Sequence, residues 1–342
     1  MNNKYKLGGV VLVFAAIACT VAVMFWPSPP STDPQHPPMR IGAYYWPGTY
    51  WIDIAHSKGW FVEAGLNVEI IDANQDYYGA VTDIHEGNLD TLTVWLFDVV
   101  KRRQMGEKLV MVLATDESVG SEALIGAGSV DSVEQLKGGR IGVPFESAMV
   151  YALDEILSHF GMTLDDVVLV DMVPETASEV LAAGEVDAVM TWEPYATRTE
   201  RTGGNRLYDS SQMPGLIMAG MIFRDDFIQG RHDEILRMLR VWHRATQYLQ
   251  SHQKEAYRIV AEVNGATTQE VADFAKHSHI MNLQDNVQAF TYASGVESLF
   301  GSARKINRYL IRKDSAVAPL IEETDLVKGR FVRALVREEE DL

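Results

Sequence analysis

The sequence predicts an α/β protein with two βαβ-type lobes, two crossing segments between the lobes, and a helical C-terminal part. Strand-like and helix-like segments alternate twice along the 342 residues, which predicts two parallel sheets. The second series also repeats a Gly-x-x-Asp-x4-Trp pattern of the first at a constant offset of 97 positions. The members of this pattern are Gly87, Asp90 and Trp95, followed by Gly184, Asp187 and Trp192.

The first series begins with a short apolar strand at 39–46. Helical spacing follows over 51–65, and a second strand occupies 66–72. A helix at 77–87 ends on a glycine, as helices often do, and a third strand follows at 89–95. Strands that alternate with helices across short turns pair in parallel, so this series predicts one βαβαβ unit.

The second series repeats the same order of elements. Strands are expected at 139–145, 166–172 and 186–192, with helices at 147–161 and 174–184 between them. Its resemblance to the first series predicts a second lobe of similar construction.

Two more strand candidates lie outside these units, at 121–127 and 216–224. We expect the first to carry the chain from the first lobe to the second, and the other to carry it back. From residue 226 onward the spacing is helical, with predicted helices at 233–252, 254–265, 268–278 and 287–301.

Two lobes on two crossing segments form a hinged clamp with a cleft between them. Ligands of open parallel sheets bind just beyond the carboxyl ends of the strands. Trp95 and Trp192 stand at equivalent strand ends, so we expect them to face each other across this cleft. The runs 95–98 and 192–195 would then form two walls of a binding site.

The N-terminal segment predicts attachment to a membrane. Lys4 and Lys6 precede residues 7–26, an uncharged apolar run long enough to cross a bilayer as a helix. We expect an uncleaved anchor, and the alternative is a lipoprotein signal cleaved before Cys19, where AIAC resembles a lipobox. Both interpretations place the protein on the periplasmic or extracytoplasmic face, tethered to the cytoplasmic membrane.

A proline-rich spacer follows the apolar run. The expected divisions are a membrane anchor or signal segment at 1–26, a linker at 27–38, a first lobe at 39–123 plus 221–325, a second lobe at 124–220, and an acidic C-terminal tail or helix at 326–342.

Composition excludes several classes of function. The formal net charge of −17 argues against nucleic acid as a partner. Cys19 is the single cysteine, so the part beyond the linker has no disulfide, thiolate metal site or cysteine nucleophile. His56 and His85 are isolated on predicted helices, and none of the common catalytic or phosphate-binding motifs occurs. We therefore expect no catalytic residue, no metal and no cofactor. We also expect the protein to be a monomer.

Four segments resemble a known family. They are KGWFVEAGLNVEI at 58–70, GNLD at 87–90, SVEQLKGGRIGV at 132–143 and AAGEVDAVMTWEPY at 182–195. Together they resemble the substrate-binding proteins of the sulfonate, nitrate and thiamine-pyrimidine family, over about 39–325. The resemblance implies a two-lobed fold of the type II periplasmic binding class. It also implies a small-molecule ligand, and the permease and ATPase subunits of an ABC importer as partners.

Carried over position by position, the resemblance places ligand loops at 44–50, 95–98, 118–121, 145–148 and 192–195. We expect these residues to bind ligand: Tyr45, Trp46, Trp95, Asp98, Ser121, Glu146, Ser147, Trp192, Glu193 and Tyr195. For Asp98 and Glu193, capping of the following helices is an equal alternative. Glu146 departs from the glycine that relatives often have in an anion-binding turn, which weakens the case for sulfonate or nitrate.

Aromatic rings beside carboxylates suit a cation or a nitrogen heterocycle, because rings stack on indole and carboxylates accept N–H groups. The basic residues nearest to the walls in sequence are those at 101–103. We expect them to belong to the helix that follows the wall at 95–98, and we therefore expect few cations in the cleft. The predicted ligand is therefore a small, neutral or cationic, nitrogen-containing organic molecule that is delivered to an ABC importer. The alternatives are a sulfonate or nitrate binder of the same family, and a membrane-tethered sensor or presenter that signals through a partner.

Overall fold

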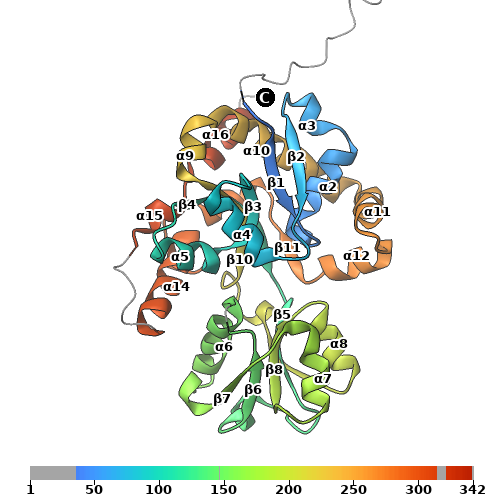
Figure 1. Ribbon diagram of the computed structural model, residues 1–342, viewed down its shortest axis with the longest axis vertical. Coiled ribbons are helices and arrows are strands. Elements are labelled where there is room, and N and C mark those ends of the chain that lie inside the picture. Colours follow the sequence, from blue (N-terminus) through green and yellow to red (C-terminus); the bar gives the residue numbers. More distant parts are fainter. Residues whose placement is uncertain (1–35, 146, 314–320, 341–342) are drawn as a thin grey trace, which may run out of the picture.

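The computed structural model describes residues 36–340, except Glu146 and residues 314–320. Two sheets with their helices form two lobes, stacked along the long axis of the molecule (Figure 1). The predicted fold class is confirmed: the protein is α/β, with two βαβ-type lobes, two crossing segments and a helical C-terminal part. Among the described residues, no helix has the length and apolar character needed to cross a membrane. The predicted anchor at 7–26 and Cys19 lie outside the described residues.

The first lobe contains a six-stranded sheet in the order β11-β4-β10-β3-β1-β2. Strand β1 is parallel to β2 and β3, whereas β10 runs antiparallel to β3 and β4, and β11 antiparallel to β4. The strands are β1 (Met39–Ala43), β2 (Val68–Asp72), β3 (Thr91–Trp95), β4 (Leu109–Ser118), β10 (Met218–Arg224) and β11 (Ser278–Ile280).

The second lobe contains a five-stranded sheet in the order β7-β6-β8-β5-β9. Its strands are β5 (Glu122–Gly126), β6 (Arg140–Val143), β7 (Val168–Asp171), β8 (Ala188–Trp192) and β9 (Asn205–Asp209). Three parallel strands are followed by an antiparallel one, as in the first lobe. In each sheet that antiparallel strand, β5 or β10, comes directly after the chain arrives from the other lobe. The two crossing segments are 119–121 and 210–217.

Most helices cover the first lobe (Figure 1). They are α2 (Tyr50–Ser57), α3 (Trp60–Glu63), α4 (Tyr77–Glu86), α5 (Leu96–Gln104), α9 (Asp225–Gly230), α10 (His232–Ser251), α11 (Gln253–Asn264), α12 (Thr268–Ala275), α13 (Leu283–Ala289), α14 (Leu299–Lys313), α15 (Glu323–Leu326) and α16 (Arg330–Glu340). The second lobe carries α6 (Ala148–His159), α7 (Ala177–Ala182) and α8 (Tyr195–Arg201).

Two helix predictions need correction. The helix expected at 51–65 is two helices, because Gly59 adopts a left-handed conformation with φ of 74° between α2 and α3. The helix expected at 287–301 is wrong: α13 ends at Ala289, α14 begins at Leu299, and the residues between them are turns and bends.

The repeated Gly-x-x-Asp pattern fixes the first strand of each lobe. Asp90 accepts the backbone N–H of Arg40 at 2.8 Å and pairs with its guanidinium at 2.9 Å, while that guanidinium also donates to the Gly87 carbonyl at 2.6 Å. In the second lobe Asp187 accepts the backbone N–H of Arg140 at 2.7 Å, and the guanidinium donates to the equivalent glycine carbonyl at 2.7 Å. The repeat is therefore a structural device that ties β1 to β3 and β6 to β8.

The predicted C-terminal tail contains a packed helix. Phe331 and Leu335 of α16 are buried, and Glu338 pairs with Arg240 of α10 at 2.7 Å. Trp242 of α10 is fully buried in the same core. Helices α10 and α16 thus complete the first lobe on the side remote from the second lobe (Figure 1).

Candidate ligand-binding site

A cavity of about 840 Å³ opens between the two lobes. It lies at the carboxyl ends of the parallel strands β1, β2, β3 and β8, which is where open α/β sheets bind ligands. First-lobe residues that line it include Tyr44, Tyr45, Trp46, Asn74, Tyr77, Tyr78, Trp95, Glu270, Asp273, Phe274 and His277. The second lobe contributes Trp192, Glu193, Pro194, Tyr195, Thr197, Arg198 and Arg201.

The first-lobe wall is an aromatic cluster held by buried polar contacts. The Trp46 indole N–H donates to Asp116 Oδ2 at 2.7 Å, and burial raises the pKa of Asp116 to about 6. Phe274 of α12 packs against Tyr45 and Trp46, each with a centroid distance of 5.4 Å. The backbone N–H of Tyr45 donates to Asn74 Oδ1 at 2.8 Å. These contacts hold the rings in place before any ligand arrives.

The two indoles predicted to face each other do so. Trp95 and Trp192 meet edge to face, with centroids 6.0 Å apart and planes at 85°. Tyr195 lies next to Trp192 at 6.3 Å, and its hydroxyl donates to Glu175 at 2.8 Å. Burial raises the pKa of Tyr195 to about 12, so its hydroxyl is a donor at neutral pH.

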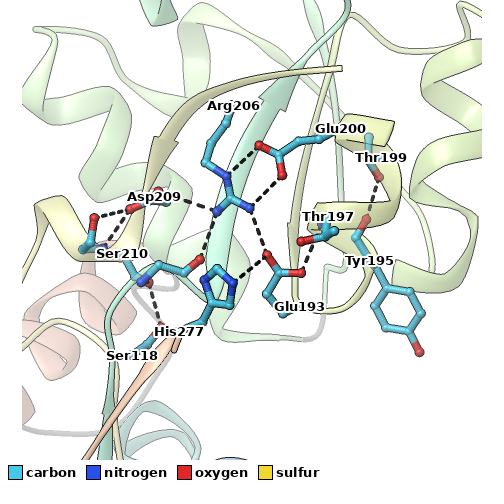
Figure 2. Close-up of polar contacts among 12 residues, drawn as sticks. Ser118, Glu193, Tyr195, Thr197, Thr199, Glu200, Arg206, Asp209, Ser210 and His277 are labelled. Carbon is cyan, nitrogen blue, oxygen red and sulfur yellow. Dashed lines mark hydrogen bonds and ion pairs between the residues drawn. The ribbon is translucent and has the colours of Figure 1, made fainter. Parts of the chain in front are cut away.

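Glu193 is buried and already has partners (Figure 2). Its Oε1 accepts from the Arg206 guanidinium at 2.9 Å, and its Oε2 accepts the backbone N–H of Thr197 at 3.1 Å. The second contact is the helix-capping alternative considered for this residue, because Thr197 lies in the first turn of α8. Glu193 therefore has hydrogen-bond donors within the protein on both carboxylate oxygens.

The other carboxylates of the lining are engaged as well. Glu270 accepts the backbone N–H of Thr267 at 2.8 Å, and Asp273 pairs with Lys276 at 2.6 Å. In contrast, Arg198 lies over the Tyr195 ring at 5.4 Å, and neither it nor Arg201 pairs with a carboxylate of the described chain. The expectation of few cations in the cleft was wrong, because α8 turns two arginines toward the cavity.

Three other predicted site residues, Asp98, Ser121 and Ser147, are not among the residues that line the cavity. Asp98 is buried and accepts from the Tyr77 hydroxyl at 3.2 Å, and burial raises its pKa to about 6. Ser121 is buried beside β5, and Ser147 caps α6 by accepting the backbone N–H of Met149 at 3.2 Å. Glu146 is outside the described residues.

Several lining residues were not predicted from the sequence. Asn74 and Tyr77 follow β2, and their position after a parallel strand could have identified them. Phe274 and His277 come from α12 and its C-terminal turn, about 230 residues after the aromatic cluster at 44–46. No local signal marks them, because they reach the cavity only through the packing of α12 beside the sheet.

Fold and site together define a two-lobed protein of the periplasmic-binding type, with an aromatic cavity between the lobes. The chain belongs to the NMT1/THI5 like family, whose model matches residues 47–256. No group of three or more potential metal-ligating side chains occurs among the residues described.

Relatives of this chain have different assigned activities. A Bacillus subtilis (strain 168) protein, provisionally named as an aliphatic sulfonates-binding protein, is 25% identical over 67% of this chain and 71% of its own. A Candida albicans protein named as a 4-amino-5-hydroxymethyl-2-methylpyrimidine phosphate synthase is 24% identical over 76% of this chain and 78% of its own. The crystal structure of the periplasmic aliphatic sulphonate binding protein SsuA from Escherichia coli superposes with a TM-score of 0.69, at 16% identity, over 84% of this chain and 96% of that one.

Proposed function

We propose that this chain is an extracytoplasmic solute-binding protein that captures a small organic molecule and delivers it to an ABC importer. The observation that carries this proposal is the cavity between the lobes, lined by aromatic rings from both. Ligand sites are typically concave, mostly apolar and placed between domains, with a few polar groups that set specificity.

A planar, nitrogen-containing ring is the ligand that the aromatic lining supports best. Trp46, Trp95, Trp192 and Tyr195 offer π-faces and edges for stacking. Carbonyl and hydroxyl groups of such a cavity can accept or donate to ring nitrogens. Because both oxygens of Glu193 already accept hydrogen bonds, from Arg206 and Thr197, Glu193 does not need a cationic ligand as its partner. The pyrimidine in the name of the Candida albicans relative has this chemistry.

A sulfonate binder is the second candidate, and one observation favours it. Arg198 and Arg201 lack carboxylate partners in the described part of the chain, and both line the cavity. Guanidinium groups recognise oxyanions with two parallel hydrogen bonds. The Bacillus subtilis relative named for aliphatic sulfonates fits this alternative.

The remaining parts of the proposal concern attachment and partners. Residues 7–26 or a lipidated Cys19 would tether the protein to the outer face of the cytoplasmic membrane. Permease and ATPase subunits would receive the ligand from a monomeric binding protein. A membrane-tethered sensor or presenter is an alternative role for the same cavity, and a neighbouring permease or kinase gene would separate the two.

A thermal-shift screen tests the proposal. The full chain in detergent is heated with amines, pyrimidines, alkanesulfonates and nitrate, one compound at a time. Stabilisation by pyrimidines supports the ring-binding proposal, because a ligand that binds only the folded state raises the melting temperature. Stabilisation by the sulfonates alone would select the second candidate, and stabilisation by none of the compounds would argue against solute binding.

A further inference from the structure

One guanidinium on β9 joins the end of β8, helix α8 and the first crossing segment (Figure 2). Arg206 of β9 donates to Glu193 at 2.9 Å, to both oxygens of Glu200 at 2.9 and 3.0 Å, and to the Gly120 carbonyl at 3.0 Å. It also lies 3.6 Å from Asp209. Burial would lower the pKa of Arg206, but the hydrogen bonds to Glu200 and Glu193 outweigh it and raise the pKa, so the group stays charged.

These contacts connect the ligand wall to both crossing segments. Glu193 directly follows Trp192, and its carboxylate also holds the start of α8 through Thr197. Gly120 lies in the first crossing segment, and Asp209 immediately precedes the second. The Arg206 guanidinium therefore connects the cavity wall at Trp192 to both crossing segments, so that a displacement of the wall displaces them as well.

The two crossing segments are also bonded to each other at this point. Ser118 and Ser210 hydroxyls lie 2.7 Å apart, and the Gly120 N–H donates to the Ser210 hydroxyl at 2.8 Å. Gly120 has φ of 110°, a conformation that residues with a side chain rarely adopt. The segments thus pass through a defined, compact crossing rather than a loose linker.

The first lobe reaches the same cluster through one side chain. His277 Nε2 lies 3.8 Å from Glu193 Oε1, and the His277 carbonyl accepts the backbone N–H of Val119 at 3.0 Å. A single guanidinium faces three carboxylates, at Glu193, Glu200 and Asp209, so the cluster keeps an excess of negative charge. That excess favours the approach of an imidazole N–H, which can donate to Glu193.

We propose that Arg206 is a positioning residue that couples the wall at Trp192 to both crossing segments, and that His277 completes this coupling when the lobes close. The inference rests on the proposed solute-binding function, because closure around a ligand is what the coupling serves. Arg206 touches no ligand itself; it sets the position of Glu193, and through it that of the neighbouring aromatic residues. Loss of the Arg206 guanidinium leaves Glu193 without its cation. It also removes the connection between the cavity wall at Trp192 and the two crossing segments.

The test measures the distance between the lobes by double electron–electron resonance, without added small molecule. Spin labels are placed on V173C in the second lobe and V263C in the first, two exposed positions, in full-length protein carrying C19S. We expect Arg206→Gln to broaden the distance distribution and shift it to longer distances, with Arg206→Lys intermediate. Glu193→Gln should act in the same way, and the double variant should move no further than either single variant.

Two further variants keep the test decisive. His277 belongs to the first lobe and is partly exposed, so His277→Gln removes the contact with Glu193 and leaves the second lobe intact. This variant should also lengthen the distances between the spin labels. Lys137→Gln is the matched control, because its exposed pair with Asp166 touches neither crossing segment. If Arg206→Gln lowers the melting temperature but leaves the distances of the parent protein unchanged, Arg206 has a purely structural role and the inference is wrong. A negative thermal-shift screen would refute the solute-binding proposal and leave this distance measurement standing.

Discussion

Trp95 and Trp192 touch edge to face across the two lobes, with ring centroids 6.0 Å apart. Each ends the third strand of its βαβαβ unit, 97 positions from the other, so the contact follows from the repeat of that unit. Both indoles line the cavity, so a ligand bound there would pack against both lobes.

Trp192→Ala should weaken binding of any cavity ligand by about 1–3 kcal/mol, the usual order for the loss of an aromatic anchor. Isothermal titration calorimetry with the best compound of the thermal-shift screen measures this directly. Trp192→Phe should retain part of the affinity. Tyr292→Ala is the control, because this tyrosine is 63% exposed and lies outside the cavity. Equal affinity of Trp192→Ala and the parent protein would place the ligand elsewhere.

The sequence predicts the two lobes well because the patterns that identify their strands are local in the sequence and occur once in each lobe. Hydrophobic periodicity identifies β1, β3, β6 and β8, and the Gly-x-x-Asp pattern marks contacts that each lobe makes within itself. The long strand β4 was not predicted, although it is buried along almost its whole length like β3 and β10, which were predicted.

The site is less predictable than the fold. Tyr45, Trp46 and Tyr195 lie at strand ends, where the topology predicts a ligand. The pairing of Glu193 with Arg206 joins β8 to β9, and β9 was not predicted. The charge of the cleft depends on such distant partners. For Glu193 the sequence left ligand contact and helix capping as equal alternatives and did not predict the pairing with Arg206. The arginines of α8 are the groups without a carboxylate partner among the described residues.

The repeat also provides a matched pair of stability variants. Asp90→Ala should lower the free energy of unfolding by about 2–4 kcal/mol, because a buried ion pair with a backbone hydrogen bond is broken. Asp187→Ala removes the equivalent backbone hydrogen bond but only a 3.9 Å ion pair, at a site whose carboxylate is 47% exposed, so about 1 kcal/mol is expected. Urea denaturation at pH 7 measures both. Equal losses for the two variants would show that burial does not set the strength of this contact.

Stability should depend on the ionisation of Glu122 in β5. Burial raises the pKa of this carboxyl from 4.5 to about 7, although a hydrogen bond from Ser118 opposes the shift. The folded state therefore holds a proton that the unfolded state has released, and the free energy of unfolding falls as the pH rises from 4.5 to about 7. The slope is at most about 1.4 kcal/mol per pH unit.

Glu122→Gln should reduce this dependence between pH 6 and 7, as measured by urea unfolding at half-unit steps, because Asp53, Asp98 and Asp116 titrate near pH 6 and retain part of the slope. Asp98 and Asp116, whose pKa values are raised to about 6 by burial, leave a slope of the same sign below pH 6. An unchanged slope between pH 6 and 7 in the variant would exclude Glu122 as its source.

Capture of a small molecule between the lobes is the central claim, and native mass spectrometry tests it most directly. The parent protein and Trp192→Ala are purified from their own host under identical mild conditions and compared without added ligand. We predict a non-covalent small molecule on the parent protein, at clearly lower occupancy on Trp192→Ala. A parent protein with no bound molecule, or a molecule equally abundant on both proteins, would contradict the proposed binding of a solute in this cavity.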